Sequence, residues 1–211
     1  MPSAMTLIVH HLNNSRSQRL LWMLEELKLP YEIRFYERDK HTMLAPPELK
    51  EVHPLGKSPV LEDGGVKLVE TGAICEYLVE KTGLLGPADQ GEGLRRYRQF
   101  LHYAEGSVMP MLLLMLAMSK IPLMGKIAIK KVQPMVDVHL DYIEHELASR
   151  PWFAGQQMSA ADIMMSFPLE AAVSRAGLGP SRPATMAWLK KIHARPAYQR
   201  ALKKGGSYDY A

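Results

Sequence analysis

Seven consecutive polar residues, Asn13 to Arg19, lie between an apolar segment and a helical pattern. Small polar side chains in this position can cap the helix that follows. They can also form a binding site, because the first backbone N–H groups of a helix have no intrahelical acceptor and attract anions. The run is therefore either capping chemistry or an anion site, and other segments must decide between the two.

A second candidate group is Ser58, which precedes Pro59 at the start of an apolar segment. A proline at this place cannot donate to a strand ladder. If the Ser58–Pro59 bond is cis, the turn exposes the N–H and C=O of Ser58 for antiparallel pairing with a bound peptide backbone. The alternative is a trans proline that simply begins an edge strand.

A third candidate is the pair Glu70 and Thr71, where a strand pattern gives way to a helical one. Glu70 could accept a hydrogen bond from an α-amino group, while the Thr71 hydroxyl and nearby N–H groups could donate to an α-carboxylate. The alternative is a plain N-cap. By contrast, Ser159 and Asp162 have the spacing of a capping box before an apolar run, which predicts a structural role at the start of a buried helix.

The composition is that of a globular protein, with 211 residues, 47% hydrophobic residues and a formal net charge of +4. The basic residues do not form a dominant block, and residues 95–98 predict a solvated helix face, so we expect no nucleic-acid partner. The apolar run 108–118 is shorter than the ~18 residues of a membrane span, so we expect no membrane partner.

Cys75 is the single cysteine, which excludes a disulfide framework. It lies in an apolar helical pattern, where a packed thiol is expected. Together with an N-terminus that lacks a secretory signal pattern, this favours a cytoplasmic protein.

The pattern of the first 83 residues predicts the order β-α-β-α-β-β-α, which is that of a thioredoxin-like sheet. The predicted segments are strands at 6–12, 31–37, 58–63 and 66–70, and helices at 17–29, around 47–52 and at 71–83. Residues 84–93 are rich in Gly and Pro and form the predicted linker. Helical patterns at 92–120, 125–149, 160–175 and 184–194 predict that residues 94–211 form an all-helical second domain.

Three segments in this order resemble the cytosolic glutathione S-transferases, in particular a bacterial and fungal branch of that family. They are SRSQRLLWMLEEL (15–27), APPELKEVHPLGKSPVLEDGGVKLVETGAICEYL (45–78) and FAGQQMSAADIMMSFPLE (153–170). The resemblance extends over nearly the whole chain. It implies a thioredoxin-like domain at 1–83 that binds glutathione and an all-helical domain at 94–211 that binds a hydrophobic electrophile, with no metal.

The resemblance also implies which residues hold glutathione. Ser58, before Pro59, would pair with the cysteinyl unit, and Glu70 with Thr71 would hold the γ-glutamyl end, where the family usually has Glu-Ser or Gln-Ser. Lys57 would either reach the glycine carboxylate or remain solvated. His53 and His41 would either line the cleft or face water.

Family branches use a Tyr, Ser or Cys near residue 15 to stabilise the glutathione thiolate, and this chain has no Tyr or Cys between residues 6 and 19. Ser15 aligns with the serine of the serine-type classes, so the resemblance implies that Ser15 is catalytic. Arg16 lies where some relatives keep an asparagine and is the second candidate. Asn13 and Asn14 are further donors, and capping alone remains the structural alternative.

The resemblance implies a detoxifying transferase that is a homodimer. The second-substrate pocket would be lined by residues of the first bundle helix and the chain end, namely Tyr103, Met109, Met111, Met115, Tyr208 and Tyr210. One alternative is a glutathione-dependent disulfide or peroxide reductase on the same fold. Another is a non-catalytic glutathione-binding or scaffold protein, since a fold does not fix a function.

Overall fold

The computed structural model of the protein describes residues 6–211. The chain divides into two compact units. Unit 1 contains the chain up to Leu84, together with Ala194–Asp209 and Ala211, and unit 2 contains Leu85–His193 with Tyr210. Each unit is described separately below.

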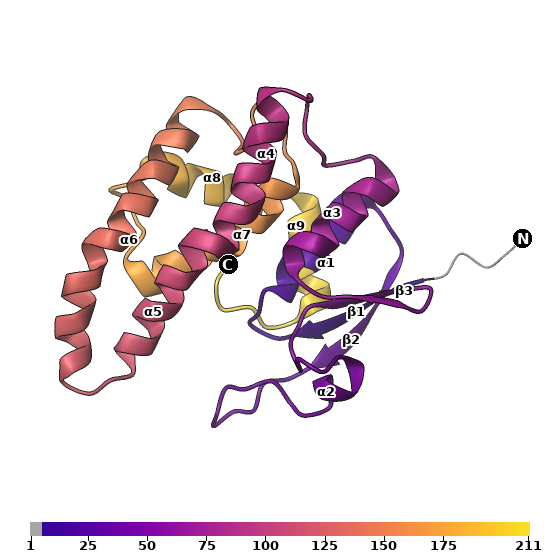
Figure 1. Ribbon diagram of the computed structural model, residues 1–211, viewed down its shortest axis with the longest axis horizontal. Coiled ribbons are helices and arrows are strands. Elements are labelled where there is room, and N and C mark those ends of the chain that lie inside the picture. Colours follow the sequence, from indigo (N-terminus) through magenta and orange to yellow (C-terminus); the bar gives the residue numbers. More distant parts are fainter. Residues whose placement is uncertain (1–5) are drawn as a thin grey trace, which may run out of the picture. The chain divides into compact units, whose positions relative to one another are not determined.

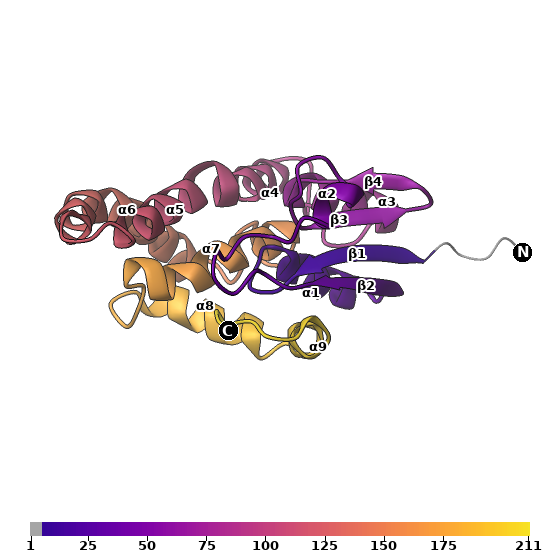
Figure 2. The same cartoon turned by 90° about the horizontal axis from the view of Figure 1, so that it is seen from below.

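Unit 1 is built on a four-stranded sheet of β1 (Leu7–Leu12), β2 (Tyr31–Tyr36), β3 (Val60–Asp63) and β4 (Val66–Leu68). The strand order is β2-β1-β3-β4, and Figures 1 and 2 show β1 beside β2. β1 runs parallel to β2, with Leu7 opposite Tyr31, and antiparallel to β3, with Val9 opposite Leu61. β1 ends at Leu12, directly before the polar run of residues 13–19.

Three helices of unit 1 connect or follow these strands along the chain: α1 (Ser17–Leu27), α2 (Leu49–Val52) and α3 (Thr71–Thr82). Leu20, Leu21 and Leu24 of α1 are fully buried, as their helical spacing predicts. The predicted order β-α-β-α-β-β-α is confirmed. It places the starts of α1 and α3, and the turn before β3, within one unit.

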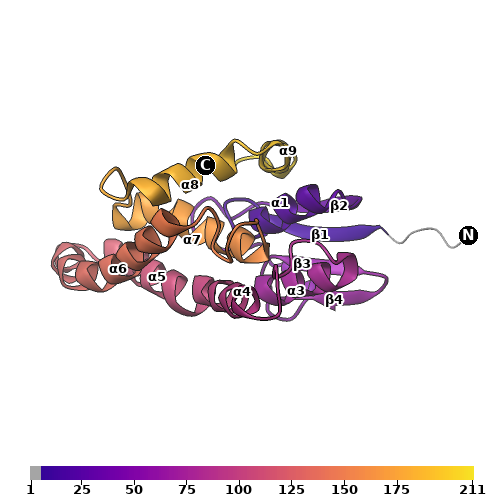
Figure 3. The ribbon, with the colours of Figure 1, turned by 90° about the horizontal axis from the view of Figure 1, so that it is seen from above.

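Unit 1 also contains a helix that the sequence patterns did not predict, α9 (Pro196–Gly205), which packs on α1 (Figure 3). Three groups donate to the Glu25 carboxylate of α1: the Tyr31 hydroxyl at 2.8 Å, Arg200 at 2.7 Å and Lys204 at 2.5 Å. The ring of Trp22 meets that of Tyr198 edge-on at 5.3 Å.

These contacts group residues 194–209 with unit 1, although the sequence assigned all of residues 94–211 to a second domain. The physical reason is that α9 carries its apolar residues and its cations on the side that faces α1. Gly205 permits the close approach, since a Cβ there would lie 2.5 Å from Gln18 Oε1 and 2.9 Å from Leu21 Cδ1.

Unit 2 is helical throughout its regular structure, as predicted, and its helices are shown in Figure 1. The first three segments are continuous: α4 (Glu92–Tyr103), a π-helical segment η1 (Ala104–Val108) and α5 (Met109–Ser119). They are followed by α6 (Met124–Ser149), α7 (Ala160–Ala176) and α8 (Pro183–His193). α7 packs against α4, α5 and α8, so it forms the centre of the unit.

The continuous helix Glu92–Ser119 has the length and hydropathy of a membrane span, although core helices of soluble proteins share both properties. This helix contains the whole apolar run 108–118, which is thus part of a longer helix than the run itself. Within unit 2, α5 packs on α6 and α7, and Leu112 and Met115 are buried in these contacts.

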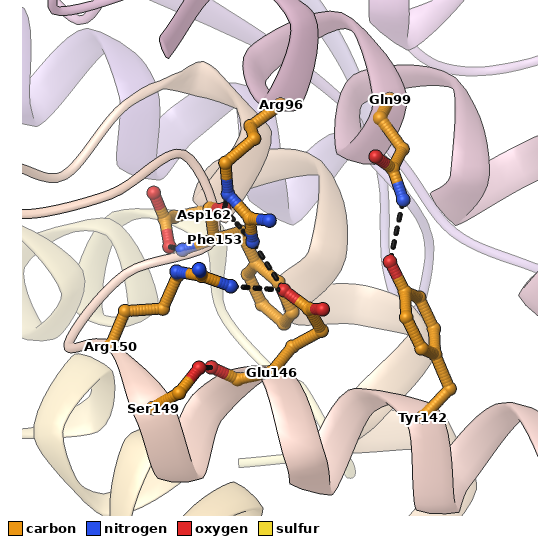
Figure 4. A network of polar contacts seen from close by, with 8 residues as sticks. All are labelled: Arg96, Gln99, Tyr142, Glu146, Ser149, Arg150, Phe153 and Asp162. Atoms are coloured by element: carbon orange, nitrogen blue, oxygen red, sulfur yellow. Dashed lines mark hydrogen bonds and ion pairs between the residues drawn. The ribbon is translucent and has the colours of Figure 1, made fainter. Parts of the chain in front are cut away.

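The start of α7 is held by a buried polar cluster, and Figure 4 draws two of its residues, Asp162 and Phe153, beside Glu146 and its partners. The Asp162 carboxylate accepts hydrogen bonds from the N–H of Ser159 at 2.9 Å and of Phe153 at 3.1 Å. Nearby, Glu146 pairs with Arg96 and, at 2.7 Å, with Arg150. The capping box predicted from Ser159 and Asp162 is confirmed.

Candidate functional site

The candidate site in unit 1 begins with Ser15, which is 5% exposed and lies just before α1. Its Oγ lies 2.7 Å from Ser17 Oγ, and it accepts a hydrogen bond from the N–H of Ser17 at 3.2 Å. Ser17 Oγ lies in turn 2.8 Å from Nδ1 of His11, the penultimate residue of β1. The two serines and the histidine thus form a buried chain of hydrogen bonds.

The tautomer of His11 follows from its partners. Its Nε2 lies 2.9 Å from the carbonyl oxygen of Gly205, which can only accept, so Nε2 carries the proton. Burial lowers the pKa of His11 to about 4, so the ring is neutral at pH 7. Nδ1 therefore has no proton and accepts a hydrogen bond from the Ser17 hydroxyl.

This tautomer fixes the direction of the whole chain. The single Ser17 proton has two internal acceptors, His11 Nδ1 and the carbonyl oxygen of Leu12 at 3.1 Å. Whichever it uses, Ser17 Oγ is the acceptor in its contact with Ser15, so the Ser15 hydroxyl donates to Ser17. In this structure the Ser15 proton points into the protein, and rotation about its C–O bond would be needed to turn it toward a ligand.

The backbone N–H groups at the start of α1 differ in their availability. The N–H of Gln18 donates to the carbonyl oxygen of Ser15 at 3.2 Å, and that of Arg19 donates to the carbonyl oxygen of Arg16 at 3.2 Å. The N–H of Ser17 is held by Ser15 Oγ. The N–H of Ser15 has no hydrogen-bond acceptor within residues 6–211. An anion at this loop would therefore find the Ser15 N–H available.

The other residues of the run have structural partners. Asn13 Oδ1 accepts from the N–H of Arg38 at 2.9 Å. Asn14 and Asp209 exchange two hydrogen bonds, at 2.7 and 2.8 Å. Arg16 is the N-cap residue of α1, where no side chain caps the helix. The structure thus brings Ser15 and Arg16 to the helix start but commits Asn13 and Asn14 to neighbouring loops.

The Ser58–Pro59 bond is cis. Ser58 Oγ donates to the carbonyl oxygen of His10 at 2.8 Å and accepts from the N–H of Leu12 at 3.2 Å, which ties this turn to the end of β1. The backbone N–H and C=O of Ser58 make no hydrogen bond within the described part of the chain. Both groups are thus open to an extended ligand backbone.

Glu70 has an unusual backbone conformation, with a φ of 67° and a ψ of 114°, and it is followed at once by α3. A positive φ is uncommon for a residue other than glycine and recurs at functional sites. The Glu70 side chain is exposed and has no hydrogen bond or ion pair to residues 6–211. The carboxylate is therefore presented to solvent at the start of a helix.

Arg19 links the two helix starts, although the sequence patterns did not mark it as a site residue. It is 1% exposed, and its guanidinium donates to Thr71 Oγ1 at 3.3 Å and to the carbonyl oxygen of Arg16 at 3.5 Å. Thr71 itself is 5% exposed. The sequence signal for Arg19 was its place directly before Leu20 and Leu21 in a helical pattern, because a cation that is buried there needs partners in the fold.

Family models match both parts of the chain. Residues 5–80 match the glutathione S-transferase N-terminal domain, and residues 108–196 match the C-terminal domain of the same family. The chain belongs to the glutathione S-transferase family. Its fold is accordingly a thioredoxin-like N-terminal domain followed by a helical C-terminal domain.

Individual relatives agree with this assignment. Glutathione S-transferase 3 of Schizosaccharomyces pombe is 36% identical, over 94% of this chain and 87% of the relative. Disulfide-bond oxidoreductase YfcG of Escherichia coli is 30% identical, over 88% of this chain and 89% of the relative. A crystal structure of a glutathione S-transferase from Actinobacillus pleuropneumoniae is 33% identical, with a TM-score of 0.88 over 97% of this chain and 95% of that one.

The other residues predicted to bind glutathione lie at the end of α2 and in the loops before and after it. Lys57 is exposed and makes no hydrogen bond or ion pair with residues 6–211. His53 is half-buried, and its Nδ1 accepts from the N–H of Leu55 at 3.3 Å. His41 is exposed in a loop whose backbone bonds to Asp39.

The residues predicted for the second substrate belong to both units. In unit 2, the Tyr103 hydroxyl lies 2.6 Å from His139 Nδ1, Met109 is 1% exposed and Met111 is half-buried. Tyr208 belongs to unit 1. Met115 and Tyr210, by contrast, line a common cavity in unit 2.

Burial raises the pKa of the Cys75 thiol to about 12, so this cysteine is a packed, unreactive residue as expected. Among residues 6–211, no group of three His, Cys, Asp or Glu side chains is placed to hold a metal ion.

Proposed function

We propose that this protein is an enzyme that binds glutathione in unit 1 and promotes attack of the glutathione thiolate on hydrophobic electrophiles, with hydroperoxides as a second class of acceptor. The support comes chiefly from Glu70. A carboxylate without a partner among residues 6–211, held on an unusual backbone at the start of α3, suits the α-amino group of a γ-glutamyl unit. Thr71 and the first N–H groups of α3 suit the adjoining α-carboxylate.

The rest of glutathione follows from this placement. The open N–H and C=O of Ser58 suit the backbone of the cysteinyl unit, and the exposed Lys57 ammonium suits the glycine carboxylate. The sulfur of the cysteinyl unit would then be directed at the loop before α1. The proposal also includes a homodimeric, cytoplasmic protein, which rests on the family alone.

The energy needed at that loop is modest. A free thiol with a pKa of ~8.5 is only slightly ionised at pH 7, and lowering the pKa by ~2 units takes about 2.7 kcal/mol of preferential thiolate stabilisation. One charge-assisted hydrogen bond contributes ~1.5–3 kcal/mol and a helix N-terminus ~0.3–1 kcal/mol. The Ser15 N–H is available, and the Ser15 hydroxyl can add a second bond by rotating away from Ser17.

Ser15→Ala tests the catalytic assignment. We expect the kcat/KM for conjugation to 1-chloro-2,4-dinitrobenzene to fall at least tenfold, while the Kd for glutathione changes little, because the sulfur is the only atom of glutathione that the hydroxyl would contact. The kinetics should be measured beside glutathione titration by calorimetry. An unchanged kcat/KM would remove the Ser15 hydroxyl from the mechanism and leave Arg16 and the Ser15 N–H as the stabilising groups.

The name of YfcG supports a second candidate function, glutathione-dependent disulfide reduction. The wild type should therefore be assayed with an aryl halide, an isothiocyanate, a hydroperoxide and a mixed disulfide of glutathione. The transferase proposal predicts the highest kcat/KM with a carbon electrophile. Turnover of the mixed disulfide alone would support the reductase, and glutathione binding without any turnover would support the non-catalytic alternative.

A further inference from the structure

Unit 2 contains a cavity of about 280 Å³ at one end of the bundle, between α5, α6, α7 and Tyr210. Its lining combines apolar side chains with two serines, an arginine and a tyrosine. The lining residues are Met115, Leu116, Ser119, Ile129, Ser174, Arg175 and Tyr210. An apolar lining with a few polar groups is the usual composition of a small-molecule site.

Arg175 differs from the other half-buried arginines of unit 2 in its charge environment. Arg96 and Arg150 pair with Glu146, and Arg182 pairs with Asp137 and Asp141 at 2.9 Å. Arg175 has no carboxylate partner among residues 6–211. A half-buried guanidinium without a counter-charge, lining a cavity, favours an anionic ligand group.

Tyr210 holds the guanidinium at the cavity wall. Arg175 donates to the Tyr210 hydroxyl at 2.8 Å, and its guanidinium carbon lies 5.3 Å from the centre of the tyrosine ring. The same ring meets Phe167 edge-on at 5.4 Å. The hydroxyls of the two serines donate within their own helices, Ser119 to Leu116 at 2.7 Å and Ser174 to Ala171 at 3.3 Å. Arg175 is therefore the one charged donor of the lining.

We propose that this cavity receives the second substrate, and that Arg175 selects electrophiles that carry a carboxylate beside an apolar body. The inference rests on the proposed transferase function. Met115 and Tyr210, which the sequence assigned to the electrophile pocket, are both part of the lining. The guanidinium binds the carboxylate in two-pronged fashion, and the methionine, leucine and isoleucine pack on the apolar body.

The reaction leaves the carboxylate untouched. With a chlorinated nitrobenzoate, the glutathione thiolate forms the carbon–sulfur bond, the carbon–chlorine bond breaks and chloride leaves with the electron pair. Arg175 therefore acts on binding and orientation. Its contribution should appear as a preference for a charged substrate over a neutral one of equal shape and similar reactivity.

The test compares 4-chloro-3-nitrobenzoate with 4-chloro-3-nitrobenzamide, which differ in charge at one position. In Arg175→Gln the kcat/KM for the benzoate should fall about tenfold or more, the effect of losing a charge-assisted bond, while the value for the benzamide stays within about twofold. Arg175→Lys should keep part of the preference, because it keeps the charge but not the planar fork. The matched control is Arg98→Gln, an exposed arginine of α4 outside the cavity, which should change neither value.

The outcomes separate the two proposals. A wild type that turns over neither probe overturns the transferase function and this inference with it. Turnover of both probes with an unchanged ratio in Arg175→Gln overturns the inference alone. A measurement on the wild type covers the case in which Arg175→Gln does not fold: 4-nitrobenzoate should inhibit turnover of the benzamide with a Ki at least about tenfold below that of 4-nitrobenzamide. Equal Ki values would overturn the inference.

Discussion

Serines lie at the starts of both α1 and α7, but they have different roles in the two places. At α7, Ser159 and Asp162 bond to each other, and Asp162 also accepts a hydrogen bond from the Phe153 N–H. Both residues are at most 1% exposed. At α1, the N-cap residue Arg16 provides no side-chain cap, and the hydroxyls of Ser15 and Ser17 are directed back toward His11.

This difference shows how a helix start becomes a site. The carboxylate at α7 satisfies the surrounding N–H groups from inside the protein, so nothing remains for a ligand. At α1 the hydroxyls satisfy one another, and the Ser15 N–H keeps no partner within residues 6–211. A serine before a helix is thus informative about function only when the donors that it leaves unsatisfied are known.

We expect the largest effect on the contrast between the two helix starts from Asp162→Ala at α7. This substitution leaves the N–H groups of Ser159 and Phe153 buried without their acceptor. At ~1–3 kcal/mol for each of these two groups, we expect the free energy of unfolding to fall by about 2–6 kcal/mol. Urea unfolding followed by circular dichroism measures it.

The control for this substitution is Asp89→Ala. Asp89 accepts from the N–H groups of Gly91 and Gly93 at the start of α4, at 2.6 and 3.1 Å, but it is exposed. Water can replace it, so the expected loss is at most about 1 kcal/mol. Equal losses for Asp162→Ala and Asp89→Ala would mean that the start of α7 is not a buried, self-satisfied cluster.

The pH dependence of stability provides the next largest effect. Burial raises the pKa of the Asp162 carboxyl from 3.8 to about 6. The folded state therefore holds this proton more tightly, and the associated stabilisation is complete below pH ~4 and is lost as the pH rises through ~6. Relative to Asp162→Asn, which does not titrate here, the wild type should lose about 3 kcal/mol of unfolding free energy across this window.

The difference between wild type and Asp162→Asn isolates this effect, because carboxyls such as Glu25 and Asp63 have lowered pKa values and contribute with the opposite sign in both proteins. Urea unfolding at pH 4, 5, 6 and 7 is sufficient. A difference that does not change with pH would show that the Asp162 carboxyl ionises in its ordinary range.

Local patterns were sufficient for most of the fold. The spacing of Leu20, Leu21 and Leu24 predicted a buried side of α1, and Pro30 predicted where this helix ends. Gly64 and Gly65 predicted the turn between β3 and β4. α9 was missed because residues 196–205 are amphipathic toward α1, a partner that is distant in sequence. A periodicity alone does not identify the surface on which a helix packs.

The site was predictable only where a residue acts by its type and local position. Ser15, Glu70 and Thr71 became candidates in this way, and their binding roles stay predictions. The role of His11 could not, because its tautomer is set by Gly205, which is 194 residues away. The direction of the Ser15 proton depends on that tautomer and hence on the tertiary structure.

The smallest effect tests this direction, through Ser17→Ala. The substitution removes the acceptor of the Ser15 hydroxyl, which becomes available to the glutathione thiolate, so the thiol pKa in the complex should fall by about 0.5 unit. In Ser15→Ala the same pKa should rise. The thiolate absorbance at 240 nm, followed against pH, reports both pKa changes.

Ser166→Ala is the control for Ser17→Ala. It removes a serine of α7 that is buried to the same degree but, among residues 6–211, bonds only to Ile163, so it should leave the pKa of the glutathione thiol unchanged. If Ser17→Ala instead raised the pKa as Ser15→Ala does, Ser17 would be holding the Ser15 hydroxyl toward the sulfur, and the inward direction of the chain would not hold in the complex.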